Sequence, residues 1–122
     1  MTMERKGVMQ LGGKAATIIG KDLQVGDKAP TFTVQKQDWT QVEMLEATKG
    51  KVRIIAAVPS LQTGVCDRET RRFNQEAASL DDGIVVITIS ADLPYSQANW
   101  CGAAGIENIE VVSDHLAAEF GI

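Results

Sequence analysis

The sequence predicts an α/β domain in which parallel strands alternate with helices. Three apolar segments rich in β-branched residues, at 52–58, 84–89 and 109–112, have the length and composition of buried strands. The two segments between them, residues 64–80 and 94–102, suit helices, because apolar side chains recur at helical spacing or a proline opens the segment. Strands connected by helical crossovers lie parallel in one sheet, so this order of elements indicates the fold class.

The composition is that of an ordinary globular protein, with 44% hydrophobic and 23% charged residues. The 122 residues suffice for one domain, which we expect to span residues 1–122. A net charge of −4 and a pI near 4.9 argue against nucleic acid or an anionic membrane surface as the main partner. No apolar run approaches the roughly 18 residues of a membrane span, and the N-terminal residues lack an apolar signal core. We therefore expect a cytoplasmic protein.

The segment before residue 52 predicts smaller elements. Two short apolar runs flank Gly12 and Gly13, a pair that suits a tight hairpin turn because such turns need positive φ. The other expected elements are a polar connector at residues 20–30, a short strand at 31–34 and a short helix at 41–49.

Signals at the ends of the later elements complete the outline. Pro59 ends the first long strand, and Thr63 is a good N-cap for the helix that follows. Pro94 opens the next helix, which Gly102 is expected to break. Ser113 is expected to cap a last helix that continues through residue 120. No further segment remains to pair beside the strand at 52–58, so that strand is expected to leave an exposed apolar edge.

Cys66 lies about three residues into an expected helix, directly after a buried strand and a short turn. Unpaired amides and the helix dipole favour an anion there, and the thiolate is the nucleophilic form of cysteine. The Thr63 hydroxyl is placed to reach the amide of Cys66 or a ligand oxygen beside the sulfur. Charged residues of both signs follow on the same helix: Arg68, Arg71 and Arg72, with Asp67 and Glu69. From position alone, a buried structural cysteine remains the commoner interpretation.

The local sequence around Cys66 changes this balance. Residues 59–66, Pro-Ser-Leu-Gln-Thr-Gly-Val-Cys, resemble the peroxiredoxin signature Pro-x-x-x-Thr-x-x-Cys, extended to Glu69 in the form Cys-x-x-Glu. Thr-Gly-Val-Cys with the following Arg-Arg-Phe-Asn is similar to the thiol peroxidase branch, the atypical two-cysteine type. Ser-Ala-Asp-Leu-Pro-Tyr at 90–95 and the Cys-Gly pair at 101–102 resemble the same branch, as does the N-terminal hairpin. The resemblance covers nearly the whole chain and implies a thioredoxin-like fold with an N-terminal β-hairpin.

The resemblance also implies roles for individual residues. Cys66 would be the peroxidatic cysteine, Thr63 would orient the peroxide oxygens, and Pro59 would shield the pocket. Cys101 would be the resolving cysteine, which condenses with the Cys66 sulfenic acid into an intrachain disulfide that a thioredoxin-like reductant reopens. The Cα atoms of the two cysteines are expected to lie beyond the ~7 Å bridging limit when reduced, so that local unfolding precedes resolution. The alternatives are a packing role for Cys101 and a purely structural disulfide.

The chain departs from the family pattern mainly in length. Family members continue past the last expected helix with a hairpin beside the strand at 52–58 and a final helix. An arginine in that part normally contacts the peroxidatic cysteine, and no arginine here is assigned that role by motif. The sequence is therefore interpreted as a C-terminally shortened peroxiredoxin fold, either truncated or naturally short. A homodimer is expected, since pairing between copies would cover the exposed strand edge.

No cofactor or metal is expected. His115 is the one histidine and suits a solvated position, the two cysteines do not match zinc-ligand spacing, and no glycine-rich phosphate loop is present. The leading interpretation is an enzyme that reduces hydrogen peroxide and alkyl hydroperoxides with two thiols. A redox switch or binding module without turnover, and an inactive fragment of such a peroxidase, remain the alternatives.

Overall fold

A computed structural model describes residues 3–116 and Phe120, and the chain divides into two compact units. One unit extends to Pro30, and the other begins at Thr31. None of the helices in the described part of the chain has both the length and the apolar character needed to cross a bilayer. The expectation of one domain over residues 1–122 stays a prediction.

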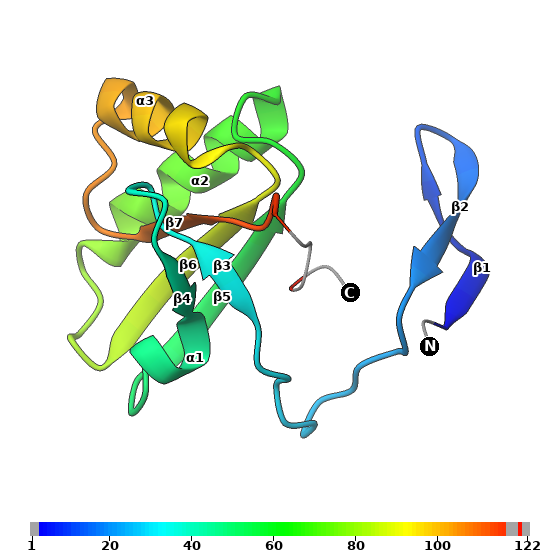
Figure 1. The fold of residues 1–122 in the computed structure, drawn as a ribbon. Coiled ribbons are helices and arrows are strands. Elements are labelled where there is room, and N and C mark those ends of the chain that lie inside the picture. The colour runs from blue at the N-terminus through cyan, green and yellow to red at the C-terminus, as the bar shows by residue number, and fades with distance from the viewer. Residues whose placement is uncertain (1–2, 117–119, 121–122) are drawn as a thin grey trace. The chain divides into compact units, whose positions relative to one another are not determined.

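The first unit is the predicted hairpin. Strands β1 (Glu4–Leu11) and β2 (Lys14–Ile19) pair antiparallel, as Figure 1 shows. Gly12 and Gly13 form the turn with φ values of 60° and 80°, a conformation that side chains with a Cβ rarely adopt. The glycine pair therefore positions the turn as the sequence predicts.

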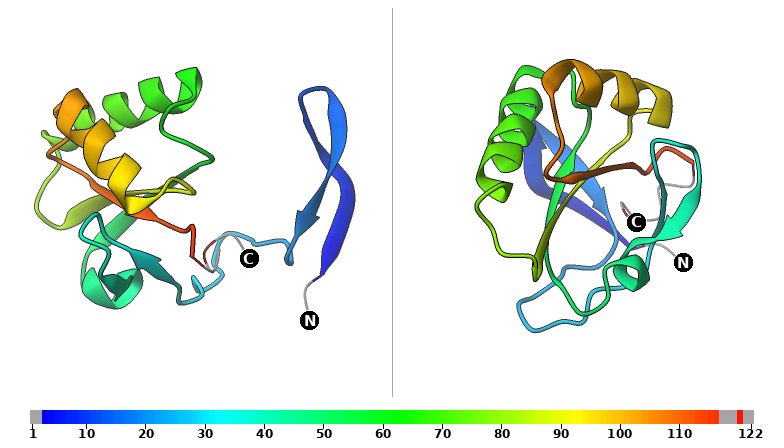
Figure 2. Two further views of the ribbon diagram at one scale, coloured as in Figure 1. Left: turned by 45° about the horizontal axis from the view of Figure 1, so that its top comes forward. Right: turned by 90° about the vertical axis from the view of Figure 1, so that its left-hand side faces the viewer.

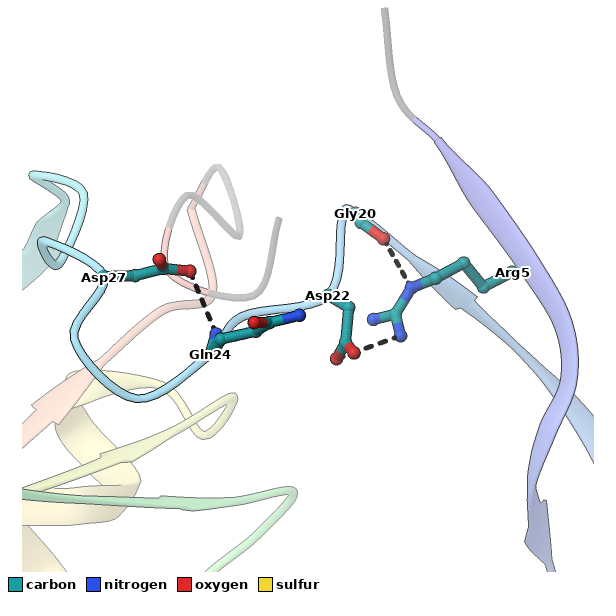
Figure 3. Close-up of polar contacts among 5 residues, drawn as sticks. All are labelled: Arg5, Gly20, Asp22, Gln24 and Asp27. Carbon is teal, nitrogen blue, oxygen red and sulfur yellow. Dashed lines mark hydrogen bonds and ion pairs between the residues drawn. The ribbon is translucent and has the colours of Figure 1, made fainter.

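The polar connector after β2 is held by local hydrogen bonds (Figure 3). Arg5 Nε donates to the Gly20 carbonyl at 2.8 Å, and its guanidinium forms an ion pair with Asp22 at 3.5 Å. Further along, the Gln24 amide donates to the Asp27 carboxylate at 2.9 Å. The side chain of Arg5 on β1 thus fixes the point at which the chain leaves the hairpin.

The second unit is built on a five-stranded sheet in the order β4-β3-β7-β6-β5. Its strands are β3 (Thr33–Gln35), β4 (Gln41–Glu43), β5 (Val52–Val58), β6 (Ile84–Ser90) and β7 (Glu110–Ser113). β5, β6 and β7 are mutually parallel, whereas β3 runs antiparallel to both β4 and β7. The three parallel strands confirm the predicted α/β arrangement.

Helices α2 (Gly64–Ala77) and α3 (Pro94–Ala104) connect the parallel strands, and Figures 1 and 2 show both on the same face of the sheet. This follows from the strand order, because two successive right-handed crossovers that advance in one direction place their helices on one side. Side chains alternate across the strands, so Val111 packs on the helix side and Val112 on the other. The sheet therefore separates two apolar clusters.

The cluster on the helix side contains both cysteines and is called the cysteine cluster below. Its buried members are Val58, Leu61, Cys66, Cys101 and Val111. The cluster on the opposite face draws on the first strands and the short helix. Its buried members are Phe32, Val34, Met44, Ile87, Ile89 and Val112.

Some sequence expectations were wrong in detail. Residues 41–43 form β4 rather than the start of a helix, because they pair with β3, and only α1 (Met44–Ala47) is helical. Gly102 does not break α3, which continues to Ala104 and ends at Gly105 with φ 69°. A glycine costs a helix only about 1 kcal/mol, whereas Gly105 in the left-handed conformation ends it.

Two further expectations concern the two ends of the parallel sheet. β5, predicted as a buried strand, is only partly buried because it lies at the edge of the described sheet, where Val52 is 65% and Ile54 37% exposed. The expected exposed apolar edge is thus confirmed. Ser113 is the last residue of β7 rather than a helix cap. Residues 117–119 of the expected last helix lie outside the described residues.

The Glu43 carboxylate links α1 to β3. It accepts hydrogen bonds from the backbone amides of Phe32 (3.3 Å), Leu45 (3.2 Å) and Glu46 (2.7 Å). Burial acts to raise the pKa of Glu43, but these amides and the charge of Arg53 outweigh it, and the net pKa is lowered. The ionised carboxylate is therefore the form that holds the helix start.

We predict that Glu43→Gln destabilises the protein at neutral pH by about 1 kcal/mol, as the loss of a helix cap typically does. Because the folded state lowers this pKa, the contribution is present above the pKa of the unfolded chain and disappears as pH falls through the folded-state value. Urea denaturation at neutral and acid pH should therefore show a difference between parent and variant that shrinks in acid. Glu46→Gln, an exposed change on the same helix, is the control, and an equal effect of both changes would contradict the prediction.

Candidate active site

The three parallel strands end on one row of the sheet. Val58 of β5 is paired with Ser90 of β6, and Ser90 is paired with Ser113 of β7. Backbone hydrogen bonds continue one step beyond the strands, from Ala91 N to Pro59 O (3.4 Å) and from Asp114 N to Ser90 O (2.9 Å). The carboxyl ends of parallel strands are where α/β proteins place their sites.

Asp92 gathers the segments that leave this row. Its carboxylate accepts hydrogen bonds from Ser60 Oγ (2.7 Å), Leu61 N (2.8 Å) and Ser90 Oγ (2.8 Å). Its backbone carbonyl accepts from Ser113 Oγ. Asp92, two positions after the last residue of β6, therefore fixes both the β5–α2 loop and the end of β7. The β5–α2 loop leads directly to Cys66.

Cys66 is the third residue of α2 and only 9% exposed. Thr63 occupies the N-cap position in an extended conformation, and its side chain makes no capping hydrogen bond to the helix within the described residues. The first-turn amides and the positive end of the helix dipole thus remain available to a negative group. At the next turn, the buried Thr70 hydroxyl donates to the Cys66 carbonyl at 2.8 Å.

Thr63 and Pro59 lie in the loop that precedes Cys66, as the motif predicts, but both residues are exposed. The Thr63 hydroxyl does not cap the Cys66 amide, one of the two roles considered for it, and instead donates to the Ser60 carbonyl at 3.1 Å. The Pro59 carbonyl accepts from Ala91 across the strand ends. Their roles toward a peroxide stay predictions.

Three arginines of the second unit are engaged in contacts with residues other than Cys66. Arg71 forms an ion pair with Asp67 and lies 5.4 Å from the ring centre of Trp100, and Arg72 pairs with Glu76 at 2.9 Å. Arg53 bonds to Thr48 and to the Leu45 carbonyl, near α1. Within the described residues, no arginine is hydrogen-bonded to Cys66. The sequence left open the sign of the electrostatic potential that these side chains produce at Cys66. The ion pairs of Arg71 and Arg72 reduce the positive contribution of both residues to that potential.

Cys101 on α3 is 6% exposed and packs in the cysteine cluster with Cys66, and both thiols are free. Gln97, one turn earlier on α3, is fully buried and donates to Ser90 Oγ (2.9 Å) and to Val112 O (2.8 Å). The polar network around Ser90 and Asp92 therefore anchors both helices that carry a thiol. The expected separation of the two Cα atoms stays a prediction.

Gln37, in the connection between β3 and β4, also reaches Cys101. Its Nε2 atom lies 3.6 Å from Cys101 Sγ and 3.5 Å from Val111 O. Burial raises the pKa of the Cys101 thiol, and the hydrogen bond from Gln37 acts in the opposite direction without cancelling it. Cys101 is thus held as the neutral thiol.

Sequence reasoning did not assign roles to Asp92, Ser60, Gln97 or Gln37. A signal for the first two was present, since polar residues follow directly after adjacent predicted strands, whose carboxyl ends meet at one edge of the sheet. No comparable signal marks Gln37, because its contact with Cys101 joins positions 64 residues apart in sequence. Trp100 packs against the cysteine cluster.

His115 does not occupy the first turn of an α-helix as expected. It is half-buried in a turn, where its Nδ1 atom lies 3.0 Å from Ser113 Oγ. Its ring meets Trp39 edge-on at 5.9 Å between ring centres. These contacts replace the fully solvated position that the sequence suggested.

Comparison with known proteins gives consistent relatives. Thiol peroxidases from Halalkalibacterium halodurans and Bacillus subtilis are each 51% identical to this chain over 109 residues, which is 89% of the chain. The chain spans 64% of the length of each of these relatives.

Solved structures agree on the fold. A peroxiredoxin-like protein from Aquifex aeolicus superimposes with a TM-score of 0.79 at 34% identity, covering 90% of this chain and 65% of that one. A thiol peroxidase from Chromobacterium violaceum shares the fold with a TM-score of 0.73 at 23% identity, over 91% of this chain and 66% of that one. The model of the AhpC/TSA family matches residues 25–122, and the chain accordingly belongs to that family, with a peroxiredoxin-type thioredoxin-like fold.

Proposed function

We propose that this protein is a thiol-dependent peroxidase that reduces hydrogen peroxide and alkyl hydroperoxides through Cys66 and Cys101. The observation that carries the proposal is the pair of free thiols in one buried cluster, one of them at the uncapped N-terminus of α2. Membership of the AhpC/TSA family and similarity to thiol peroxidases support the same activity. Thr63 and Pro59 complete the proposed site, as orienting and shielding residues.

The chemistry proceeds in two steps on the chain itself. The Cys66 thiolate attacks one peroxide oxygen, forming an S–O bond and breaking the O–O bond, and the leaving oxygen takes a proton and departs as water or alcohol. The first-turn amides of α2 would stabilise the negative charge during this step. Cys101 then attacks the Cys66 sulfenic acid, so that an S–S bond forms and water leaves. A thioredoxin-like dithiol would reduce the disulfide, as it reduces other exchange-competent disulfides.

A cytoplasmic location fits this cycle, because a disulfide that must be reduced after each turnover needs a reducing compartment. A redox switch without turnover is the second candidate. It is favoured by one observation, that Arg71, Arg72 and Arg53 are all engaged in contacts away from Cys66. Repeated consumption of peroxide in the presence of a thioredoxin system distinguishes the two.

The first prediction concerns the thiols. One equivalent of hydrogen peroxide should abolish both free thiols of the parent and lower its intact mass by two hydrogen atoms. Cys101→Ser should instead accumulate a sulfenic acid that a dione reagent traps, and Cys66→Ser should keep its thiol because Cys101 is held neutral. Thiol titration and intact mass spectrometry measure both outcomes. If both parent thiols persist, the chain is an inactive fragment of a peroxidase.

A second prediction concerns Asp92. Asp92→Asn keeps the shape of the side chain but replaces one of the two acceptor oxygens by a donor, which faces groups that themselves donate. We expect a loss of about 1–3 kcal/mol of unfolding free energy and slower sulfenic acid formation at Cys66. Urea denaturation and rapid-quench dione labelling measure the two effects. Asp82→Asn, in an exposed turn, is the control, and parent-like behaviour of Asp92→Asn would refute the positioning role.

We further propose that the protein forms a homodimer through the edge of β5. In the described part of the chain this strand pairs only with β6, and Arg53, its one charged residue, is drawn toward α1 by its hydrogen bonds. The edge therefore lacks the charges, prolines and bulges by which proteins usually block strand pairing. A second copy presents the same uncharged edge and can pair with it antiparallel.

Val52→Lys should weaken this association, because it places a charge on the exposed part of the edge. Light scattering across a concentration series should show dimers for the parent and at least tenfold weaker association for the variant, which corresponds to about 1.4 kcal/mol. Leu80→Lys, a substitution of a similarly apolar residue after α2, should behave like the parent. A parent that stays monomeric at every concentration would exclude the dimer.

A further inference from the structure

The turn that carries Gln37 is fixed by its own hydrogen bonds. Lys36 N donates to Thr40 O, and Trp39 N donates to Lys36 O, both at 2.9 Å. The Asp38 carboxylate accepts from the amide of Thr40 at 3.1 Å and from its hydroxyl at 2.5 Å. With its backbone held inside this turn, Gln37 has a defined position from which its side chain extends toward α3.

The side chain of Gln37 donates a hydrogen bond to β7 at a position where the sheet has no backbone hydrogen bond from β3. β3 and β7 pair antiparallel at one position only, Gln35 with Ser113. The next pair with the same hydrogen-bonding pattern in this register would join Gln37, two residues after Gln35, to Val111, two residues before Ser113, but Gln37 already lies in the turn after β3. Gln37 Nε2 supplies the donor for Val111 O at 3.5 Å and at the same time lies 3.6 Å from Cys101 Sγ. A side-chain amide has two N–H groups, one for each acceptor.

We propose that Gln37 is a catalytic residue for the resolving step: local opening is confined to the first turn of α2, α3 stays folded, and the Gln37 amide stabilises the Cys101 thiolate as Cys101 attacks the Cys66 sulfenic acid. The inference rests on the proposed function and extends it to a residue outside the peroxiredoxin motif. A neutral thiol is a weak acceptor, whereas a thiolate forms a stronger, charge-assisted hydrogen bond. The contact therefore becomes more favourable as Cys101 loses its proton, which is the condition for accelerating a step.

The surroundings of Cys101 make this donor important. Burial in the cysteine cluster raises the pKa of the thiol, and the hydrogen bond from Gln37 is the opposing influence. Gln37 is itself half-buried, so solvent screens the contact only in part. Loss of the amide would leave the full effect of burial on the Cys101 thiolate.

The other titratable and charged groups on the elements around Cys101 do not replace Gln37. They are Cys66, Asp67, Arg68, Glu69, Arg71, Arg72 and Glu76 on α2, Tyr95 on α3, Glu107 after it, Glu110 at the start of β7, and Lys36 and Asp38 in the turn. Arg72 pairs with Glu76, and the side chains of Arg68, Glu69, Tyr95 and Glu107 are exposed. Asp67 and Arg71 neutralise each other as an ion pair, and the residues of the turn and of β7 are exposed. Cys66 has become the electrophilic sulfenic acid when Cys101 reacts, and it carries no thiolate charge at that stage.

The atoms balance without another reactant. Cys101 loses its thiol proton, its sulfur forms the S–S bond with Cys66, and the S–O bond of the sulfenic acid breaks. The departing hydroxide takes up one proton and leaves as water. Cys101 is oxidised and the sulfenic sulfur is reduced, so the peroxide consumed in the previous step is the oxidant for the whole sequence.

A direct test measures the titration of Cys101 in the Cys66→Ser background, by the ultraviolet absorbance of the thiolate. Gln37→Leu should raise the Cys101 pKa by about one unit, because the donor is lost. Gln37→Glu, which has the same shape but carries a negative charge, should raise it further, and Gln37→Lys should lower it again by supplying a cation. Gln75→Leu, an exposed glutamine on α2, should leave it unchanged.

The same Gln37 substitutions in the two-cysteine protein test the resolving step. Sulfenic acid should form at the parent rate, whereas disulfide formation in Gln37→Leu should be about tenfold slower below the pKa, equivalent to one pKa unit. The rates of disulfide formation in the parent and in Gln37→Leu should converge at alkaline pH, and Gln37→Lys should restore the parent rate at lower pH. Rapid quench with a dione, followed by intact mass measurement, separates the two steps.

These measurements distinguish the possible failures. The inference is overturned if Gln37→Leu, Gln37→Glu and Gln37→Lys all leave the pKa of Cys101 unchanged. It is also overturned if the three substitutions slow disulfide formation equally without shifting its pH profile, since Gln37 would then only anchor β7. If the parent forms no sulfenic acid, the proposed function fails, while the titration in the Cys66→Ser background still decides whether Gln37 stabilises the thiolate.

Discussion

Three hydrogen-bond donors converge on the Asp92 carboxylate, and they come from two chain segments that leave the sheet side by side. A carboxylate is suited to this position because it accepts several bonds and donates none. Ser90, one of the donors, also accepts from Gln97, which lies one turn before Cys101 on α3. The β5–α2 loop, which leads to Cys66, and the helix of Cys101 therefore share one polar anchor. Without it, the apolar packing of the cysteine cluster would have to determine the relation between the two thiols, and such packing is not directional.

The anchor works because three strands end in register. Val58, Ser90 and Ser113 lie on one row of the parallel sheet, so the chain reverses direction at the same level after each strand. β6, buried on both faces, is the rigid centre of this arrangement, whereas β5 has a neighbour on one side only among the described strands. The strand that leads to Cys66 is thus the less constrained one. Two of the three donors to the Asp92 carboxylate, Ser60 and Leu61, come from the loop that follows this strand.

Periodicity and turn chemistry predicted the three parallel strands, the hairpin at Gly12 and Gly13, and both long helices, because these features depend on local sequence. Pairing between distant segments was harder to foresee. Residues 41–43 have helical neighbours but form a strand because β3 offers free backbone groups. The motif located Cys66 and its loop, whereas Gln37 reaches Cys101 only because β3 turns away from β7 two residues before a ladder bond would form. A side chain that substitutes for a backbone donor leaves no periodic trace in sequence.

The roles proposed for the two thiols place opposite requirements on residues of the same cluster. A peroxidatic thiol needs a stabilised anion before the reaction, and the uncapped first turn of α2 provides amides for Cys66 from the helix itself. A resolving thiol benefits from remaining protonated until its partner is oxidised, since a thiolate would itself be open to oxidation. Burial raises the pKa of Cys101, and the hydrogen bond from Gln37 acts in the opposite direction. In the proposed cycle, burial would give this protection, and Gln37 would still let the proton be lost when the sulfenic acid is present. In the proposed cycle, the different donors of the two sites, backbone amides at Cys66 and one side-chain amide at Cys101, would set the order in which the two sulfurs react.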